Sequence, residues 1–330
     1  MIDREYLVGD INFVTDAVVA YSSNRKTRWA SSSGGVVSEL IRYLFSIGFV
    51  ATAIRFTFTP QNYYSPELIY NFDDYNITGS IYHNINLIAF LRRNITAIEG
   101  RIVVVCLPCQ VSPIRHVLNR HRVQSFIICL TCSAQMRKGA TTFFLNAHKI
   151  DRNMVTCLQY RGKGWPSGIT ITMDDRREIS FRNTRSDWEC IFHSYVFHLS
   201  RCLRCNRVFG CGADINVGDP WLSRYKREGG DGCSMVLVCS GQGQAVLDGA
   251  VRFGAILIRE RLTTSEVIES QLSTFIKKYV LCRHRRAFRF LFRMIRSNIY
   301  VHNVFKYPLV YRYHYRIVNK IIFLVAQIRS

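Results

Sequence analysis

Apolar runs alternate with helical patterns over the first half of the chain. Four apolar runs predict buried strands at 18–21, 49–56, 102–105 and 126–128. Apolar positions at helical spacing predict helices over 36–46, 112–118 and 138–148. Strands that alternate with helices in this way are typical of βαβ units. The pattern therefore predicts an α/β fold with a sheet that contains parallel pairs.

The pattern changes between residues 160 and 238. Short alternating segments, such as 169–173 and 235–238, are separated by Gly, Asp and Asn residues typical of turns. This region predicts a smaller mixed or antiparallel part. The predicted fold class is thus mixed α/β (α+β), with a basic helical C-terminal tail.

The tail, residues 271–330, is strongly basic. After Glu269 there is no acidic residue, and that stretch carries 13 of the 44 Lys and Arg residues. Arg286, Arg289 and Arg293 share one helical side and Phe288 and Phe292 another, which predicts an amphipathic helix that Pro308 ends, with a second helix over 317–328. We expect the tail to dock on an anionic membrane surface or an acidic partner rather than on the core. The alternative is a core-packed helix with a solvated basic face.

Composition limits the class of protein. A chain of 330 residues with 48% hydrophobic residues buries a sizeable core. No run of about 18 apolar residues occurs, and the first ten residues lack the apolar segment of a secretory signal. We therefore expect a cytoplasmic protein, with the tail as its contact to the inner face of the membrane. The basic tail lacks a nucleic-acid-binding motif, so no specific nucleic acid is expected.

The twelve cysteines include three Cys-x-x-Cys pairs, formed by Cys106 and Cys109, Cys129 and Cys132, and Cys202 and Cys205. The first two pairs have the spacing of a four-cysteine zinc ribbon. However, each follows a predicted buried strand, and open α/β sheets place cofactors at that edge. A redox cofactor is therefore favoured over zinc, and a thiol redox motif ranks third.

A serine-glycine loop precedes the first predicted helix. The glycines let the backbone approach an anion, and the helix N-terminus supplies unpaired N–H groups for a phosphate. The loop consists of Ser31, Ser32, Ser33, Gly34 and Gly35. A plain helix start is the alternative explanation.

The ordered set of motifs resembles the coenzyme F420 hydrogenase/dehydrogenase beta subunit family, in particular bacterial members associated with polysaccharide biosynthesis. The resemblance covers about 220 residues. It rests on the serine-glycine loop, 79–82 (Gly-Ser-Ile-Tyr), 107–110 (Leu-Pro-Cys-Gln), Cys132, 161–165 (Arg-Gly-Lys-Gly-Trp), 202–205 (Cys-Leu-Arg-Cys), 213–221 (Ala-Asp-Ile-Asn-Val-Gly-Asp-Pro-Trp) and 232–234 (Gly-Cys-Ser).

The resemblance implies a flavin, FAD before FMN, and one [4Fe-4S] cluster. It assigns the cluster ligands to Cys109, Cys132, Cys202 and Cys205, whereas Cys106 and Cys129 stand where the family usually has glycine. It assigns the flavin or substrate site to the serine-glycine loop together with Gly79, Ser80, Tyr82, Arg161, Lys163 and Trp165. Ile81 replaces the family's lysine and removes one expected contact.

These implications divide the chain into four parts. They are a leader (1–15), an α/β flavin-binding half (16–150), a mixed half with the third cysteine pair and the Asp214 to Trp221 motif (151–270), and the basic tail (271–330). The predicted function is an iron-sulfur flavoprotein oxidoreductase that passes electrons to a partner protein or a small-molecule substrate. A zinc-stabilised, non-enzymatic binding module is the alternative.

Overall fold

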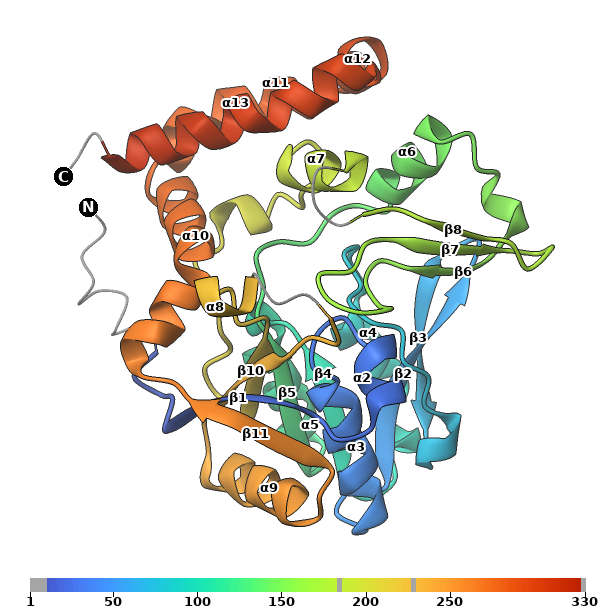
Figure 1. The fold of residues 1–330 in the computed structure, drawn as a ribbon, viewed down its shortest axis with the longest axis vertical. Helices are drawn as coiled ribbons and strands as arrows, with labels where there is room; N and C mark the ends of the chain where they lie inside the picture. Colours follow the sequence, from blue (N-terminus) through green and yellow to red (C-terminus); the bar gives the residue numbers. More distant parts are fainter. Residues whose placement is uncertain (1–10, 183–185, 227–229, 328–330) are drawn as a thin grey trace.

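The protein is described by a computed structural model that covers residues 11–182, 186–226 and 230–327. Eight strands form one large sheet in the order β11-β1-β10-β9-β5-β4-β2-β3 (Figure 1). Their bounds are β1 (Asp16–Ser22), β2 (Thr52–Thr59), β3 (Tyr63–Ile69), β4 (Ile102–Cys106), β5 (Ser125–Leu130), β9 (Ile215–Gly218), β10 (Ser234–Val238) and β11 (Ile256–Arg261). Strands β2, β4, β5 and β9 are parallel neighbours, and the outer pairs are antiparallel. The predicted fold class is confirmed.

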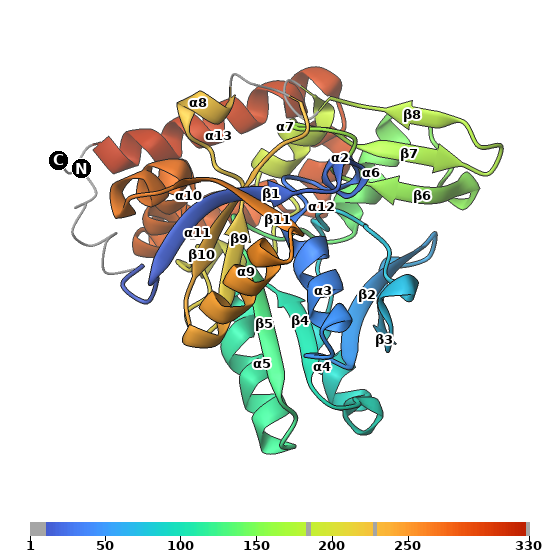
Figure 2. The same ribbon diagram turned by 60° about the horizontal axis from the view of Figure 1, so that its bottom comes forward.

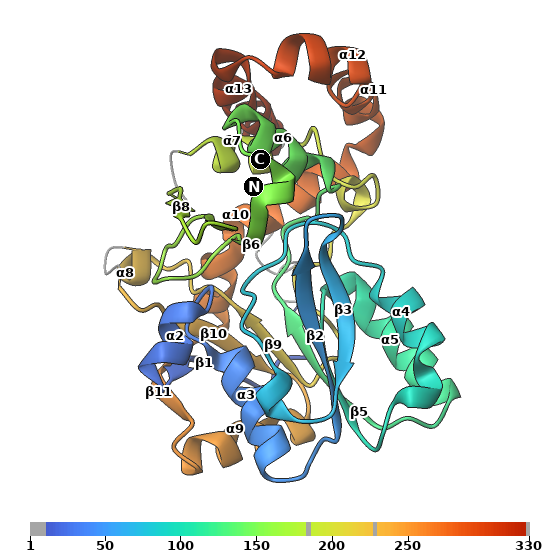
Figure 3. The same ribbon diagram turned by 90° about the vertical axis from the view of Figure 1, so that its right-hand side faces the viewer.

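The central strands are buried on both faces, which explains why they are continuous apolar runs. Val103 and Phe126 face one core cluster, while Val104 and Ile127 face another. Helices α3 (Val36–Ser46) and α9 (Gly241–Arg252) cover the first face, and α4 (Leu87–Arg93) and α5 (Pro108–Arg120) cover the second (Figure 3). The sheet is thus the middle of three layers.

A second, antiparallel sheet contains β6 (Val155–Gln159), β7 (Thr170–Met173) and β8 (Glu178–Ser180) (Figure 2). It packs with α6 (Gly139–Ala147) and α7 (Asp187–His193) around an aromatic cluster that includes Phe144, Tyr160 and Trp188. This confirms the smaller antiparallel region. Strand β10, from the same stretch of sequence, joins the large sheet instead.

Two predicted boundaries were wrong. Helix α5 begins at Pro108, not Ser112, because a proline fits the first helical position, where its missing N–H would have no partner. Strand β2 begins at Thr52 because the preceding residues still close α3, with the Phe49 N–H donating to the Leu44 carbonyl. The first correction matters for the site, since it moves Cys109 into a helix.

The C-terminal region is helical, as predicted. It contains α10 (Thr264–Arg283), α11 (Arg285–Ile295), α12 (Asn298–Tyr300), a π-helical turn (Val301–Phe305) and α13 (Pro308–Gln327). Pro308 does not break a helix; it begins α13, again as a first residue without a needed N–H. Two shorter helices, α2 (Arg25–Ala30) and α8 (Ser223–Lys226), precede this region.

The expectation that the tail docks away from the core was wrong. Phe288, Phe292, Phe305 and Val318 are buried in the same cluster as Trp188 of α7. The inward apolar faces of these helices therefore belong to the core. Within the described parts of the chain, no helix combines the length and the apolar character needed to span a membrane.

Candidate cofactor site

Three segments meet at one edge of the large sheet. Because β4, β5 and β9 run parallel, the start of α5 and the loops at 131–135 and 219–221 follow strand ends on the same edge. Ligands of open α/β sheets bind at this kind of edge. The serine-glycine loop reaches it too, since the Gly34 N–H donates to the Ser234 hydroxyl at the start of β10 (3.0 Å).

The four cysteines predicted as cluster ligands converge beside this edge. Cys109 lies in the first turn of α5, Cys132 follows β5, and Cys202 and Cys205 flank a single 3₁₀ turn. Burial raises the pKa of the Cys132 thiol to about 12, with smaller contributions from the thiols of Cys202, Cys109 and Cys205. Cys132 therefore lies near the other three cysteines.

A buried lysine lies beside this thiol group. Lys278 of α10 is only 5% exposed, and its Nζ donates to the Arg207 carbonyl (2.5 Å) and lies 3.9 Å from Cys205 Sγ. Burial raises the pKa of Cys132 and of Cys109, and the positive charge of Lys278 lowers both by a smaller amount. Lysine is rarely this buried without a compensating partner. The sequence does not distinguish Lys278 as a site residue, because it is one of two adjacent lysines in an apolar stretch.

Thiol side chains can hold either a zinc ion or an iron-sulfur cluster. Among the described residues, no group of three or more His, Cys, Asp or Glu side chains is placed to hold one metal ion. Structural zinc needs four ligands within about 2.0–2.3 Å of the metal. In a cubane each thiolate binds a different iron, so its ligands stand further apart. Four thiols are the donor type that an iron-sulfur cluster needs, and metal and sulfide analysis distinguishes it from zinc.

Cys106 and Cys129 are placed differently. They are partners on adjacent parallel strands, 3% and 0% exposed, and both pack in the cluster between the sheet and α5. Burial is the main reason that the pKa of each is raised. Cys211, which is close in sequence to Cys205, lies exposed in a turn.

The serine hydroxyls of the loop already donate to backbone carbonyls. Ser31 donates to Thr27 (2.8 Å), Ser32 to Arg161 (3.3 Å) and Ser33 to Cys233. The helix that follows, α3, has Gly35 at its N-cap with a φ of 78° and no side-chain cap. Its first N–H groups are therefore the donors that remain for an anion.

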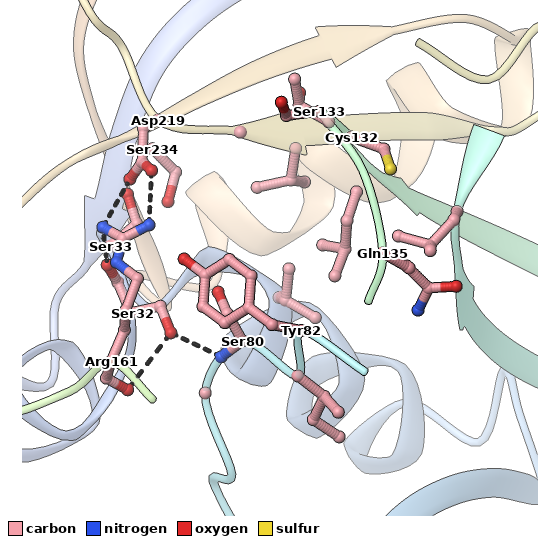
Figure 4. Close-up of a pocket in the computed structure, with 18 of the residues that line it drawn as sticks. Ser32, Ser33, Ser80, Tyr82, Cys132, Ser133, Gln135, Arg161, Asp219 and Ser234 are labelled. Atoms are coloured by element: carbon pink, nitrogen blue, oxygen red, sulfur yellow. Dashed lines mark hydrogen bonds and ion pairs between the residues drawn. The ribbon is translucent and has the colours of Figure 1, made fainter. Parts of the chain in front are cut away.

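Arg161 ties the loop to three other segments (Figure 4). Its guanidinium, buried, donates to Asp219 Oδ2 (2.6 Å) and to the Ser32 carbonyl (2.6 Å). Burial lowers the pKa of Arg161, but Asp219 and Tyr82 outweigh it and the pKa is raised. Trp165 Nε1 donates to the same carboxylate (3.0 Å). Arg161 therefore stays charged and organises the wall of the site.

Residues 79 and 80 join this network directly. The Ser80 N–H donates to Ser32 Oγ (2.6 Å), and Gly79 has a φ of 68°. A Cβ at residue 79 would lie 2.3 Å from the Arg161 carbonyl oxygen. Gly79 is therefore required for this close approach.

A cavity of about 910 Å³ runs from the loop to Cys132, one member of the thiol group. Figure 4 shows Ser32, Ser33 and Arg161 on one side, Tyr82 between, and Cys132 and Gln135 on the other. The volume is at the upper end of the usual range for ligand sites, about 300–1,000 Å³. The predicted residues that line it are Ser31, Ser32, Ser33, Gly35, Gly79, Ser80, Tyr82, Arg161 and Cys132.

Six predicted site residues do not line the cavity, namely Cys109, Cys202 and Cys205 of the thiol group and Gly34, Lys163 and Trp165. Gly34 packs against backbone, where a Cβ would lie 2.6 Å from Ser234 N. Lys163 forms an ion pair with Glu178 (2.5 Å), and Trp165 packs against Trp221, which does line the cavity. Asp214 of the 213–221 motif pairs with Arg115 (2.6 Å) and accepts a hydrogen bond from the Ile127 N–H (2.8 Å), so its role is structural.

The C-terminal helices supply cavity residues that the motifs did not predict. Gln271 and Lys277 of α10 and Phe323 of α13 line it. Burial lowers the pKa of Lys277 to about 8, and its Nζ lies 5.8 Å from the centre of the Phe323 ring. The helices that the sequence placed outside the catalytic part thus close this side of the cavity.

The fold and site define a class: an α/β protein with a long cofactor-sized cavity beside grouped thiols. Residues 99–262 match the family described as the C terminus of the coenzyme F420 hydrogenase/dehydrogenase beta subunit. The chain belongs to the coenzyme F420 hydrogenase/dehydrogenase beta subunit family, whose members are subunits of oxidoreductases. The predicted family resemblance is confirmed at this level.

A solved structure shares the fold. It is a chain of the F420-reducing [NiFe] hydrogenase complex from Methanosarcina barkeri, with a TM-score of 0.62 and 15% sequence identity. The alignment covers 83% of this chain and 93% of that chain. No curated protein matches the sequence.

Proposed function

We propose that the protein is a flavin- and [4Fe-4S]-dependent electron-transfer oxidoreductase. The observation that carries the proposal is the cavity that extends from an uncapped helix N-terminus to Cys132, which lies near the other three thiols. A flavin exchanges electrons in pairs and a cluster exchanges them singly, so the two together couple two-electron to one-electron chemistry.

Cys109, Cys132, Cys202 and Cys205 would hold the cluster. Four thiolates bound to a cubane leave a net negative charge, which is costly in a buried site without a nearby cation. The Lys278 ammonium, 3.9 Å from Cys205 Sγ, meets that need, and the Gln135 N–H donates to Cys202 Sγ (3.4 Å). Both contacts are of the outer-shell kind that tunes a metal centre.

The start of α3 would hold the phosphates of the flavin, with FAD preferred because the family resemblance implies it. Gly35, Val36 and Val37 line the cavity where the helix begins. The helix dipole and free N–H groups favour an anion there, although the serine hydroxyls are engaged elsewhere. Ile81 also lines the cavity, so the lost lysine contact is not replaced at that position.

The electron partner is either a protein or a small molecule. The structural neighbour belongs to a hydrogenase complex, which supports a protein partner. The resemblance to members associated with polysaccharide biosynthesis supports a saccharide-linked substrate. The half-buried Lys277 offers such a substrate a cation in the cavity wall.

Anaerobic purification followed by iron, acid-labile sulfide, zinc and flavin analysis tests the proposal. We expect about four iron and four sulfide atoms and one flavin per chain. Stoichiometric zinc without sulfide after anaerobic reconstitution would instead establish the zinc-stabilised binding module.

The flavin site is tested by Val37→Asp, with Val37→Asn as the matched uncharged control. A carboxylate in the first turn satisfies the helix dipole and repels a phosphate. We expect flavin affinity about five- to tenfold weaker in the first variant and nearly unchanged in the second, with thermal stability retained in both. Equal flavin content in the two variants would move the phosphates away from α3.

A further inference from the structure

The exposed apolar side chains of the protein are concentrated in its C-terminal helices. Of the 17 large hydrophobic residues exposed in the described parts of the chain, ten lie between residues 290 and 324. The most exposed are Phe290, Ile299 and Leu309, at 77%, 75% and 72%. Helices α11 to α13 lie together at the end of the molecule opposite α9 (Figures 1 and 3). Such a concentration marks an interaction surface.

Helix α13 has two apolar faces. Tyr311, Val318 and Ile322 face inward and are buried in the core cluster. Leu309, Tyr313 and Ile317, at intervals of four residues, form a second stripe that is exposed. A helix that is apolar on both sides is expected to be covered on both sides. The core covers only one.

Basic side chains border the exposed stripe. Arg312, Arg316 and Lys320 are exposed on the same helix, and of these three only Arg312 is paired with an acidic residue of the described chain, Asp187 (2.8 Å). Exposed arginines likewise accompany Phe290 and Met294 on α11, namely Arg286, Arg289 and Arg293. No Asp or Glu follows Glu269 in the sequence. The exposed surface of these helices thus combines apolar groups with positive charge only.

We infer that the outer surface of α11 to α13 binds an anionic lipid bilayer, with the stripe of Leu309, Tyr313 and Ile317 entering the interface. Apolar residues flanked by Lys and Arg are the pattern of helices that lie in the plane of a membrane surface. Each basic residue near an anionic leaflet adds to the attraction. A second copy of the chain would bring like charges together, which disfavours self-association.

This surface is separate from the cavity, and the inference holds whether or not the proposed cofactors bind. The inward faces of the same helices remain in the core, so membrane contact requires no unfolding of the tail.

Co-sedimentation of the full chain with lipid vesicles tests the inference. We expect binding to vesicles of equal parts phosphatidylglycerol and phosphatidylcholine, weak binding to pure phosphatidylcholine, and loss of binding as NaCl rises from about 50 to about 500 mM. The double variant Leu309→Glu/Ile317→Glu should bind anionic vesicles at least tenfold more weakly, which corresponds to about 1.4 kcal/mol.

Phe253→Glu/Leu257→Glu is the matched control, because both residues are exposed and lie at or near the end of α9 that is distant from α13. It should bind like the wild type, and circular dichroism should show both variants folded. Equal binding by both double variants, or none by the wild type, would overturn the inference. So would a dimer in vesicle-free solution that Leu309→Glu/Ile317→Glu abolishes, since a second copy would then cover the surface.

Discussion

Two sets of cysteines lie at the same edge of the sheet but in different environments. Cys106 and Cys129 are strand residues whose side-chain directions are set by the pleat, and both are buried against α5. Cys109, Cys132, Cys202 and Cys205 lie in loops or helix starts and are only partly buried. The same Cys-x-x-Cys spacing thus gives one packing residue and one ligand candidate in each of the first two pairs. Spacing alone does not define a metal site; the direction of each side chain does.

Cofactor content should separate the two sets most strongly. We expect Cys109→Ala or Cys202→Ala to lose nearly all bound iron and sulfide, because a cubane needs its four thiolates. Cys106→Ala, three residues from Cys109, should retain them. Iron, sulfide and visible absorbance after anaerobic purification provide the measurement. The opposite pattern would support the zinc alternative, in which the first two Cys-x-x-Cys pairs are the ligands.

Stability of the metal-free protein should show the reverse order. Cys129→Ser places a hydroxyl in a fully buried site, and we expect it to lower the free energy of unfolding by about 1–3 kcal/mol. Cys205→Ser lies in a partly exposed turn and should change it by less than about 0.5 kcal/mol. Urea unfolding of the two variants measures these changes. An equal decrease in the free energy of unfolding would mean that the loop thiols are also packed in the core.

The charge beside the ligand set should tune its potential. Lys278→Met removes a buried cation near Cys205 and should lower the cluster reduction potential by on the order of 50 mV. Lys277→Met, the next residue on α10, changes the cavity wall instead and serves as the control. A redox titration followed by electron paramagnetic resonance measures both. Identical shifts would show that Lys278 has no particular relation to the thiols.

Thiol reactivity in the metal-free protein should show the smallest difference between the two sets of cysteines. Burial raises the pKa of Cys106 and of Cys129, so at pH 8 both stay protonated and unreactive. In metal-free protein, iodoacetamide should modify the exposed Cys211 first and leave these two unmodified until the protein unfolds. Mass spectrometry of digested samples follows each site. Early labelling of Cys129 would show that β5 opens locally.

Several elements followed directly from local pattern. The strands at β4 and β5 and the helix at 36–46 were predicted because a segment buried on both faces, or on one helical face, has a short-range signature. The start of α5 was missed because a proline at a helix start resembles a break. The Pro308 prediction failed for the same reason.

The motifs indicated which residues gather at the site, but not the role of each. The serine-glycine loop, Gly79, Ser80 and Arg161 do meet, yet the serine hydroxyls donate to carbonyls supplied by Thr27, Arg161 and Cys233. Lys163 pairs with Glu178 on a strand of the small sheet. These hydrogen-bond partners all lie outside the motif, and those of Ser32 and Ser33 are distant in sequence, so the motif alone does not predict them.

The amino-acid sequence determined the fold class, the family and the set of thiols, since periodicity and residue type are local properties. Only the tertiary structure decided that the tail is part of the core, that Lys278 faces the thiols, and that α13 keeps a second apolar face. Each of these depends on which side of a helix meets another element. A helix with apolar residues on two sides has two ways to pack, and the rest of the fold selects one.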